Sequence, residues 1–276
     1  MIRIDSHQHF WNYDPNRHPW MSAEMTTLKT NFLPRNLLPE LQNCSLDGCV
    51  AVQADQSEAE NAFLLRLADE YGMIKGIVGW VDLQADNLEE RLVYYRQFPQ
   101  IKGFRHVVHD EADRGFMLRP AFMRGIGLLK KYNYTYDLLI FPEHLANTLE
   151  LVTAFPNQPF VIDHLAKPFI KTGEITAWQK AMREVAAYDN VYCKISGMTT
   201  EADWKRWKQQ DFEPYLDQVV DCFGPDRIMY GSDWPVCRLA ATYEEVFSIV
   251  KSYFSSFSER EQQKFFGENA IKFYNL

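Results

Sequence analysis

The first candidate functional residues in the sequence are two histidines near its start, His7 and His9. They lie in the run 2–10, which favours a β-strand, and side chains two residues apart on a strand point to the same face. Neighbouring imidazoles can ligate a metal ion, transfer a proton or bind a substrate. The same alternation predicts that Asp5 lies on this face, one layer below. A hydrogen-bonded pair of core histidines is the alternative, but polar groups inside a closed sheet are costly unless function uses them.

A carboxylate, Asp233, follows another apolar run near the end of the chain. The run 228–232 is typical of a strand, and a carboxylate directly after it could take a proton from water or ligate a metal ion. Because Pro235 follows closely, a turn or helix-capping aspartate is the alternative. Opposite the two histidines across a closed sheet, a functional role is favoured.

Further polar and aromatic side chains follow other predicted strands. His164 ends the run 161–164 and is expected to face the same rim. Arg105 and His106 are adjacent, so they point to opposite faces of a strand and only one of them faces the pocket. The candidate catalytic residues are Asp233, His164, His9 and Arg105, and the candidate substrate-binding residues are His7, Trp11, Gln53, Asp55, Trp80, Asp82, His106 and Trp234.

The pattern along the chain predicts a single-domain (β/α)8 TIM barrel over residues 1–276, in the α/β class. Continuous Val, Ile, Phe and Tyr runs, typical of strands buried on both faces, alternate with amphipathic helical patterns. A doubly wound sheet is the alternative, but Gly125-Ile126-Gly127 lacks the third glycine of a dinucleotide fingerprint. In a barrel, chemistry gathers at the carboxyl ends of the strands. The predicted strands are 2–10, 48–54, 74–81, 101–108, 134–140, 160–164, 191–196 and 227–231.

Composition excludes several classes of protein. The chain has 276 residues, 46% apolar and 24% charged, and a net charge of −8. These fractions are those of a globular chain, and an acidic surface argues against nucleic acid as a partner. Five cysteines without a CxxC spacing predict reduced thiols. Without a signal-peptide pattern or an uncharged stretch of the ~20 residues that a membrane span needs, a cytoplasmic protein without membrane contact is expected.

Ordered motifs along the whole chain resemble one family. The opening IDSHQHFW at 4–11 is similar to the start of the amidohydrolase superfamily, in its amidohydrolase-2 branch. The set as a whole most resembles the sugar-lactonase group, which hydrolyses L-fuconolactone and L-rhamnonolactone and has 2-pyrone-4,6-dicarboxylate lactonase as a relative. The further motifs are KGIVGWVD at 75–82, KGFRH at 102–106, DHLAKP at 163–168, KISG at 194–197, YGSDWP at 230–235 and GENA at 267–270.

The resemblance implies a barrel hydrolase and gives roles to matching positions. His7 and His9 would be the histidine pair of the first strand, and His164 the histidine of the sixth. Asp233 would be the carboxylate of the eighth strand, which handles the proton of the attacking water. Arg105 matches the arginine that related lactonases turn toward the substrate.

The resemblance leaves the metal content open. Where binuclear relatives have a bridging lysine this chain has Arg105, and the fifth strand carries no histidine, so two metals are not expected. One divalent ion held by His7, His9 and Asp233 is one expectation, with zinc the best match to nitrogen and oxygen ligands. A metal-free site is the other, since the group is thought to include members that work without metal.

The expected activity is hydrolysis of a sugar lactone such as L-fuconolactone to its aldonic acid. Alternatives are a 2-pyrone-4,6-dicarboxylate-type lactonase, a metal-dependent decarboxylase, or a barrel that binds without catalysing. A dicarboxylate should require several arginines, yet only Arg105 lies clearly at a strand end, with Arg238 after the last strand. The expected partner is the small lactone, and a homo-oligomer is compatible with the sequence.

Overall fold

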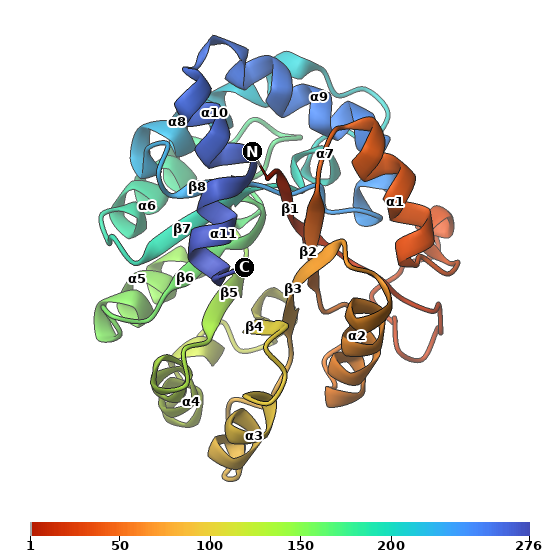
Figure 1. Cartoon of the computed structure of the whole chain (residues 1–276). Helices are drawn as coiled ribbons and strands as arrows, with labels where there is room; N and C mark the ends of the chain where they lie inside the picture. Colours follow the sequence, from red (N-terminus) through yellow and green to blue (C-terminus); the bar gives the residue numbers. More distant parts are fainter. Residues whose placement is uncertain (1) are drawn as a thin grey trace.

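A computed structural model describes residues 2–276, in which eight parallel strands form a barrel (Figure 1). Each strand pairs with its neighbours in sequence. The last strand meets the first through a parallel bridge between Gln8 and Trp234, where the His9 amide donates to the Trp234 carbonyl at 2.7 Å. The predicted (β/α)8 barrel is therefore confirmed. The strands are β1 (Ile4–Gln8), β2 (Gly48–Val52), β3 (Ile74–Gly79), β4 (Ile101–Val107), β5 (Thr135–Leu139), β6 (Phe160–Ile162), β7 (Val191–Ile195) and β8 (Ile228–Tyr230).

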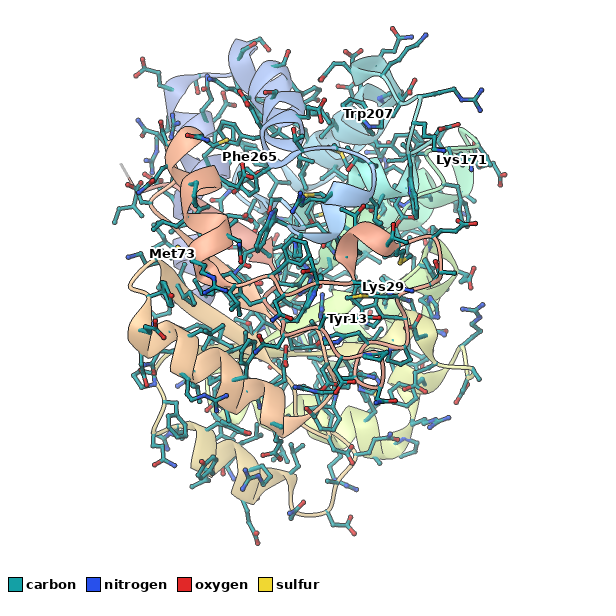
Figure 2. The ribbon with its side chains drawn as sticks, turned by 90° about the vertical axis from the view of Figure 1, so that its right-hand side faces the viewer. Tyr13, Lys29, Met73, Lys171, Trp207 and Phe265 are labelled. Carbon is teal, nitrogen blue, oxygen red and sulfur yellow. The ribbon has the colours of Figure 1, made fainter. Side chains whose placement is uncertain are left out.

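Helices connect the strands and cover the outside of the barrel (Figures 1 and 2). The helix Glu58–Glu70 begins at a capping serine, because Ser57 Oγ accepts a hydrogen bond from the Glu60 amide at 3.3 Å. The helices are α1 (Pro34–Asn43), α2 (Glu58–Glu70), α3 (Leu88–Tyr95), α4 (Pro120–Lys131), α5 (Leu145–Ala154), α6 (Thr176–Ala186), α7 (Met198–Glu201), α8 (Glu213–Phe223), α9 (Tyr243–Tyr253), α10 (Glu259–Gln263) and α11 (Asn269–Tyr274). None of the helices in residues 2–276 is long and apolar enough to cross a membrane.

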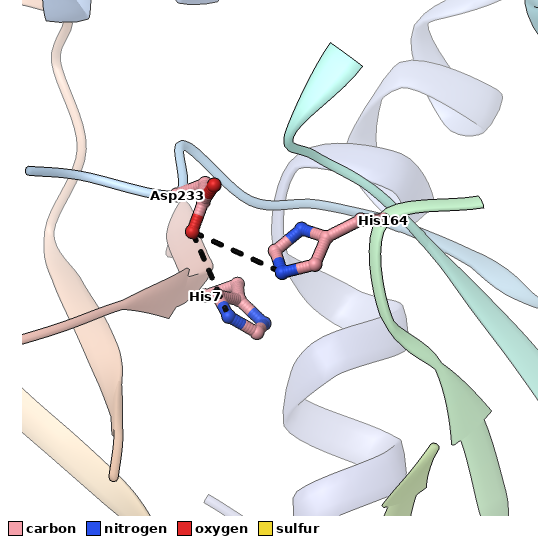
Figure 3. A group of neighbouring side chains, drawn as sticks. All are labelled: His7, His164 and Asp233. Carbon is pink, nitrogen blue, oxygen red and sulfur yellow. Dashed lines mark ion pairs between the residues drawn. The ribbon is translucent and has the colours of Figure 1, made fainter. Parts of the chain in front are cut away.

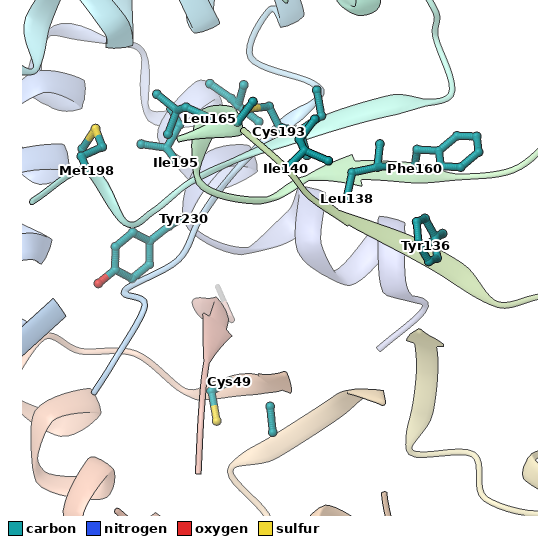
Figure 4. Close-up of a cluster of buried hydrophobic side chains, with 14 of the residues drawn as sticks. Cys49, Tyr136, Leu138, Ile140, Phe160, Leu165, Cys193, Ile195, Met198 and Tyr230 are labelled. Carbon is teal, nitrogen blue, oxygen red and sulfur yellow. The ribbon is translucent and has the colours of Figure 1, made fainter. Parts of the chain in front are cut away.

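The apolar side chains form two layers, as buried strands require. The larger cluster joins the strands to the surrounding helices, and Figure 4 shows part of it, including Tyr136, Phe160 and Tyr230. A smaller cluster fills one end of the barrel interior with alternate strand residues such as Val50 and Met229. The polar groups described below occupy the interior above this smaller cluster.

A bulge in β1 decides which side chains face the interior. Asp5 pairs with Cys49 and Gln8 with Ala51, so β1 contains one more residue than β2 across this interval. The additional residue reverses the alternation. Asp5 consequently accepts a hydrogen bond from Tyr243 of α9 at 2.9 Å, outside the strands. The prediction that Asp5 shares a face with the two histidines was wrong, because a period of two holds only in a regular strand.

The last helix closes the amino-terminal end of the barrel. The sequence predicts helices over 258–274 that pack outside, and α10 and α11 do form there. However, Ala270, Phe273 and Tyr274 of α11 are buried against the interior cluster. The chain therefore ends beneath the polar interior (Figure 1), and the expectation of external packing was wrong for α11.

Candidate active site

Three histidines converge on one carboxylate at the carboxyl ends of the strands. Asp233 Oδ1 lies 3.5 Å from His9 Nε2, 3.8 Å from His164 Nε2 and 4.0 Å from His7 Nε2. Figure 3 shows His7 and His164 pointing toward Asp233 from different strands. The Nε2 atoms of His7 and His9 are 3.2 Å apart. All four side chains are nearly inaccessible to solvent.

The opposite nitrogen of each histidine ring is held by an oxygen atom. His9 Nδ1 lies 2.8 Å from the Val52 carbonyl, His164 Nδ1 lies 2.8 Å from Ser196 Oγ, and His7 Nδ1 lies 3.2 Å from Asp163 Oδ1. A carbonyl only accepts, so His9 carries its proton on Nδ1 and presents the lone pair of Nε2 to Asp233. Such contacts fix the ring orientation of histidines that ligate metals.

Unusual backbone conformations direct two of these side chains. His164, Leu165, Ala166 and Lys167 all have φ between 50° and 59°, so the chain makes a left-handed turn directly after β6. Asp233 also has φ of 57°. Left-handed geometry costs about 1–2 kcal/mol for each residue with a Cβ atom, and such strain concentrates at functional sites.

A glycine makes room for His164. Gly197 follows β7 and has φ of +63°, and a Cβ atom there would lie 2.7 Å from His164 Nδ1. The KISG motif therefore supplies both Ser196, which holds the imidazole, and the glycine beside it.

Burial and neighbouring groups set the protonation states of the site. Burial lowers the pKa of His7 and of His164 well below the usual value, so both rings are neutral near pH 7. Burial also raises the pKa of Asp233, but His164 and His9 outweigh this effect and hold the pKa of its carboxyl below 3.8. The site thus combines an ionised carboxylate with neutral imidazoles.

Beneath the histidines lies a group of buried charges. Arg105 NH1 is 3.1 Å from Asp163 Oδ2 and 3.3 Å from His7 Nε2. Lys194 Nζ is 3.0 Å from Asp163 and 2.5 Å from Asp137. Burial raises the pKa of Asp163, yet Lys194, His7 and Arg105 together hold it well below the usual range. Two cations and two carboxylates therefore balance one another inside the barrel.

A cavity of about 660 Å³ opens above the site. His9, Arg105, His164 and Asp233 line its base. Its walls carry two ion pairs and two tryptophans. Arg17 pairs with Asp55 at 2.7 Å, Lys167 pairs with Glu201, and Trp20 and Trp204 also line the cavity. Met25, Val236 and Leu239 add apolar surface.

The structure brings the predicted catalytic residues together. It also places Asp55, a predicted substrate-binding residue, on the cavity wall. Of the adjacent pair, Arg105 faces the interior, whereas His106 stacks on Phe116 at 4.7 Å and lies 2.7 Å from Glu111. His7 lies just beneath the cavity, in contact with His9.

Five other residues predicted to bind substrate lie away from this cavity lining. Trp11 donates to the Thr30 carbonyl and packs on Phe32, and Trp234 packs on Phe10 and Phe32. These packing and backbone contacts account for the positions of the two tryptophans. They were predicted to bind substrate only because they follow strands. The other three are Gln53, which donates to the Arg105 carbonyl, Trp80, which donates to His106, and Asp82, which accepts from the Gln84 amide.

Several residues of the site were missed in the sequence. Asp137 and Lys194 stand inside otherwise apolar strand runs, and Asp163 directly follows one, so a charge in or beside such a run is the signal that could have found them. Arg17 and Glu201 lie on connections after the strands, and their local sequence has no comparable mark.

The donor set fits a single divalent metal ion. Ligand atoms of His7, His164 and Asp233 all lie within 4.8 Å of one another, and His9 Nε2 completes the group. The Nε2 atoms of the three histidines lie 3.5–4.0 Å from Asp233 Oδ1, and those of His7 and His9 lie 3.2 Å apart, so one ion could contact all four side chains. The predicted ligands His7, His9 and Asp233 thus meet, with His164 as a fourth.

The fold and this site are those of an amidohydrolase, and comparison with known proteins agrees. The Amidohydrolase family matches residues 4–276, so the chain belongs to that family. An L-fucono-1,5-lactonase of Burkholderia multivorans is 40% identical over all of this chain and 96% of its own length. An L-fucono-1,5-lactonase of Burkholderia ambifaria is 32% identical, again over 100% of this chain and 96% of the relative.

Solved structures give the same assignment. Two crystal structures of an amidohydrolase from Burkholderia multivorans, each 40% identical and covering both chains completely, superpose with TM-scores of 0.97 and 0.96. The first contains bound HEPES and the second bound zinc.

Proposed function

We propose that this protein is a sugar lactonase that opens an L-fuconolactone-like ring to the aldonic acid. The observation that carries the proposal is the convergence of three anchored imidazoles on Asp233 at the base of a cavity whose cations are already paired. The two L-fucono-1,5-lactonases that cover the whole chain support the same reaction.

The charge balance of the cavity favours a neutral substrate. Arg17 pairs with Asp55 and Glu60, Arg105 with Asp163, and Lys167 with Glu201. A dicarboxylate would need cations that are free to bind it. A sugar lactone offers hydroxyl groups, which can donate to the carboxylates and accept from the cations of the same pairs.

Proton transfer in this proposal passes through Asp233. The ionised carboxylate accepts a proton from water as the water oxygen attacks the lactone carbonyl carbon. The bond between that carbon and the ring oxygen then breaks, and Asp233 returns the proton to the ring oxygen, which becomes a hydroxyl group. Arg105, whose guanidinium lines the base of the cavity, would donate to the carbonyl oxygen as its negative charge develops.

His7, His9, His164 and Asp233 would hold a divalent metal ion, with zinc the metal that their nitrogen and oxygen atoms suit best. When bound, the ion would polarise the carbonyl group and lower the pKa of water. The fixed Nδ1 contacts of the histidines keep their Nε2 atoms directed toward this position.

A substrate panel tests the proposal. Acid release is followed with a pH indicator in weak buffer, with L-fucono-1,5-lactone, L-rhamnono-γ-lactone and 2-pyrone-4,6-dicarboxylate as substrates. We expect a sugar lactone to react at least ~100-fold faster than the dicarboxylate, because the cations that line the cavity are already paired with carboxylates of the protein. Faster reaction of the dicarboxylate, or no release from either sugar lactone above the spontaneous rate, would overturn the proposal.

The Lys167–Glu201 pair is expected to bind sugar hydroxyls. Lys167→Met removes one charged hydrogen-bond donor, which is worth about 1.5–3 kcal/mol, so KM should rise roughly 10-fold or more while kcat changes little. Lys171→Met, at an exposed position outside the cavity lining, is the matched control. Equal KM values for the two variants would contradict this role.

A further inference from the structure

Lys194 is a fully buried cation that the proposed reaction does not use. It lies on β7 with no side-chain exposure, and its Nζ contacts Asp137 at 2.5 Å, Asp163 at 3.0 Å and His7 Nδ1 at 3.1 Å. Taking an ammonium group out of water is costly, and apolar residues often replace buried ion pairs without loss of stability. The stability of the barrel therefore does not by itself explain why a lysine stands here.

The contacts of Lys194 tie it to a catalytic-site histidine. Asp163 touches Lys194 through Oδ1, His7 Nδ1 through the same oxygen at 3.2 Å, and Arg105 through Oδ2 at 3.1 Å. The ring of His7 is thus bounded by Lys194 and Asp163 on its Nδ1 side. With that side fixed, Nε2 is directed toward His9, Asp233 and the Arg105 guanidinium.

The same contacts continue to the end of the chain. Tyr274 of α11 donates from its hydroxyl to Asp137 Oδ2 at 2.8 Å, the oxygen that also contacts Lys194. The Lys194 ammonium lies 5.4 Å from the centre of the Tyr274 ring. Tyr274 is buried, so α11 lies directly beneath the buried charges and contacts them through this side chain.

We propose that Lys194 is a positioning residue for His7 and that Tyr274 holds it in place through Asp137. Lys194 and Asp163 orient the His7 imidazole, and the C-terminal helix thereby sets the geometry of the site at the other end of the barrel. The inference rests on the proposed role of His7 in that site, although the orientation of the ring can be measured independently of any activity.

Tyr274→Phe is the least disruptive test, because it removes one hydroxyl group. Tyr134→Phe is the matched control, since Tyr134 is also buried and its hydroxyl donates to the Leu92 carbonyl outside the barrel interior. We expect Tyr274→Phe to lower kcat about 10-fold with KM changed less than about twofold, as losses of such supporting contacts do. Zinc affinity, measured by competition with a chromophoric chelator, should fall by a similar factor. Tyr134→Phe should change neither quantity.

Lys194→Met extends the test to the cation itself and should lower kcat and zinc affinity further. The ring ¹⁵N NMR signals of His7 should shift in Tyr274→Phe and Lys194→Met but not in Tyr134→Phe. Unchanged His7 signals would overturn the proposal, as would kcat losses no larger than in Tyr134→Phe. If the wild-type protein hydrolyses no sugar lactone, the proposed function fails, while the NMR signals and zinc affinity still decide the role of Lys194.

Discussion

At Asp233, two opposing effects act on one carboxyl group. Burial favours the neutral acid, whereas the adjacent His164 and His9 favour the anion and prevail, so the pKa is lowered. His7 and His164 respond to burial in the other direction and stay neutral. A carboxylate and imidazoles in these states can accept a proton and present lone pairs at the same pH.

The lowered pKa values predict activity that persists in mild acid. Because the pKa of His7 and His164 is lowered, their neutral forms dominate on both sides of pH 6.5, and Asp233 remains ionised there. After subtraction of spontaneous hydrolysis, kcat/KM should therefore be flat from about pH 8 to about pH 6. A loss of half the activity centred near pH 6.5 would show that an ordinary imidazole controls the reaction.

Residue types indicated the chemistry better than they indicated the binding surface. The HxH spacing and a carboxylate after the last strand were enough to name His7, His9 and Asp233, because strand ends meet on one rim. Trp11 and Trp234 were named by the same rule, yet they pack in the core. Position on a strand end does not reveal whether a side chain points to the rim or to the surrounding helices.

At the scale of elements, alternation of buried strands with helices was sufficient to predict the barrel. Two local departures could not be predicted from that pattern. The bulge in β1 turns Asp5 outward, and the left-handed turn 164–167 contains no glycine that would have marked it. Residues far apart in sequence hold both features in place. Asp5 of the bulge contacts Tyr243, and His164 of the turn contacts Ser196.

The turn after β7 offers a prediction on function and stability together. In Gly197→Ala, the new methyl group would meet His164 Nδ1 at 2.7 Å in addition to the strain of positive φ. We expect kcat to fall at least ~100-fold, because displacement of a reacting group by about 1 Å costs that much. The assay is lactone hydrolysis with parallel thermal melting.

Gly173→Ala provides the control for backbone strain alone. Gly173 also has positive φ, at +72°, but a Cβ atom there would meet nothing within 4 Å. It should lose about 1 kcal/mol of stability and retain full activity. If Gly197→Ala is as active as Gly173→Ala, the close approach to His164 has no catalytic importance.

At the scale of the whole molecule, the site lies across the seam of the barrel. His7 and His9 belong to β1 and its end, whereas Asp233 follows β8, and the Asp233 amide donates to the His7 carbonyl at 2.8 Å where the two strands meet. His164 comes from β6, on the far side of β7. A ligand held by these side chains would join strands that are distant in sequence.

Metal binding should therefore stabilise the entire fold. Zinc at about 100 times its Kd should add roughly 2.7 kcal/mol to the chelator-treated protein, or several degrees in Tm. His9→Ala should lose most of this shift, whereas His109→Ala, which changes a histidine paired with Asp110 on the cavity wall, should keep it. An equal zinc shift in both variants would place the metal elsewhere.

The central claim is that Asp233 carries the proton in the hydrolysis of a sugar lactone. The most direct measurement compares acid release from L-fucono-1,5-lactone by the wild-type protein and by Asp233→Asn, with melting curves to show that both are folded. The amide keeps the shape of the side chain but cannot accept the water proton, so the rate should fall by about 10³-fold or more. A folded Asp233→Asn protein that retains a tenth of the wild-type rate would contradict the account.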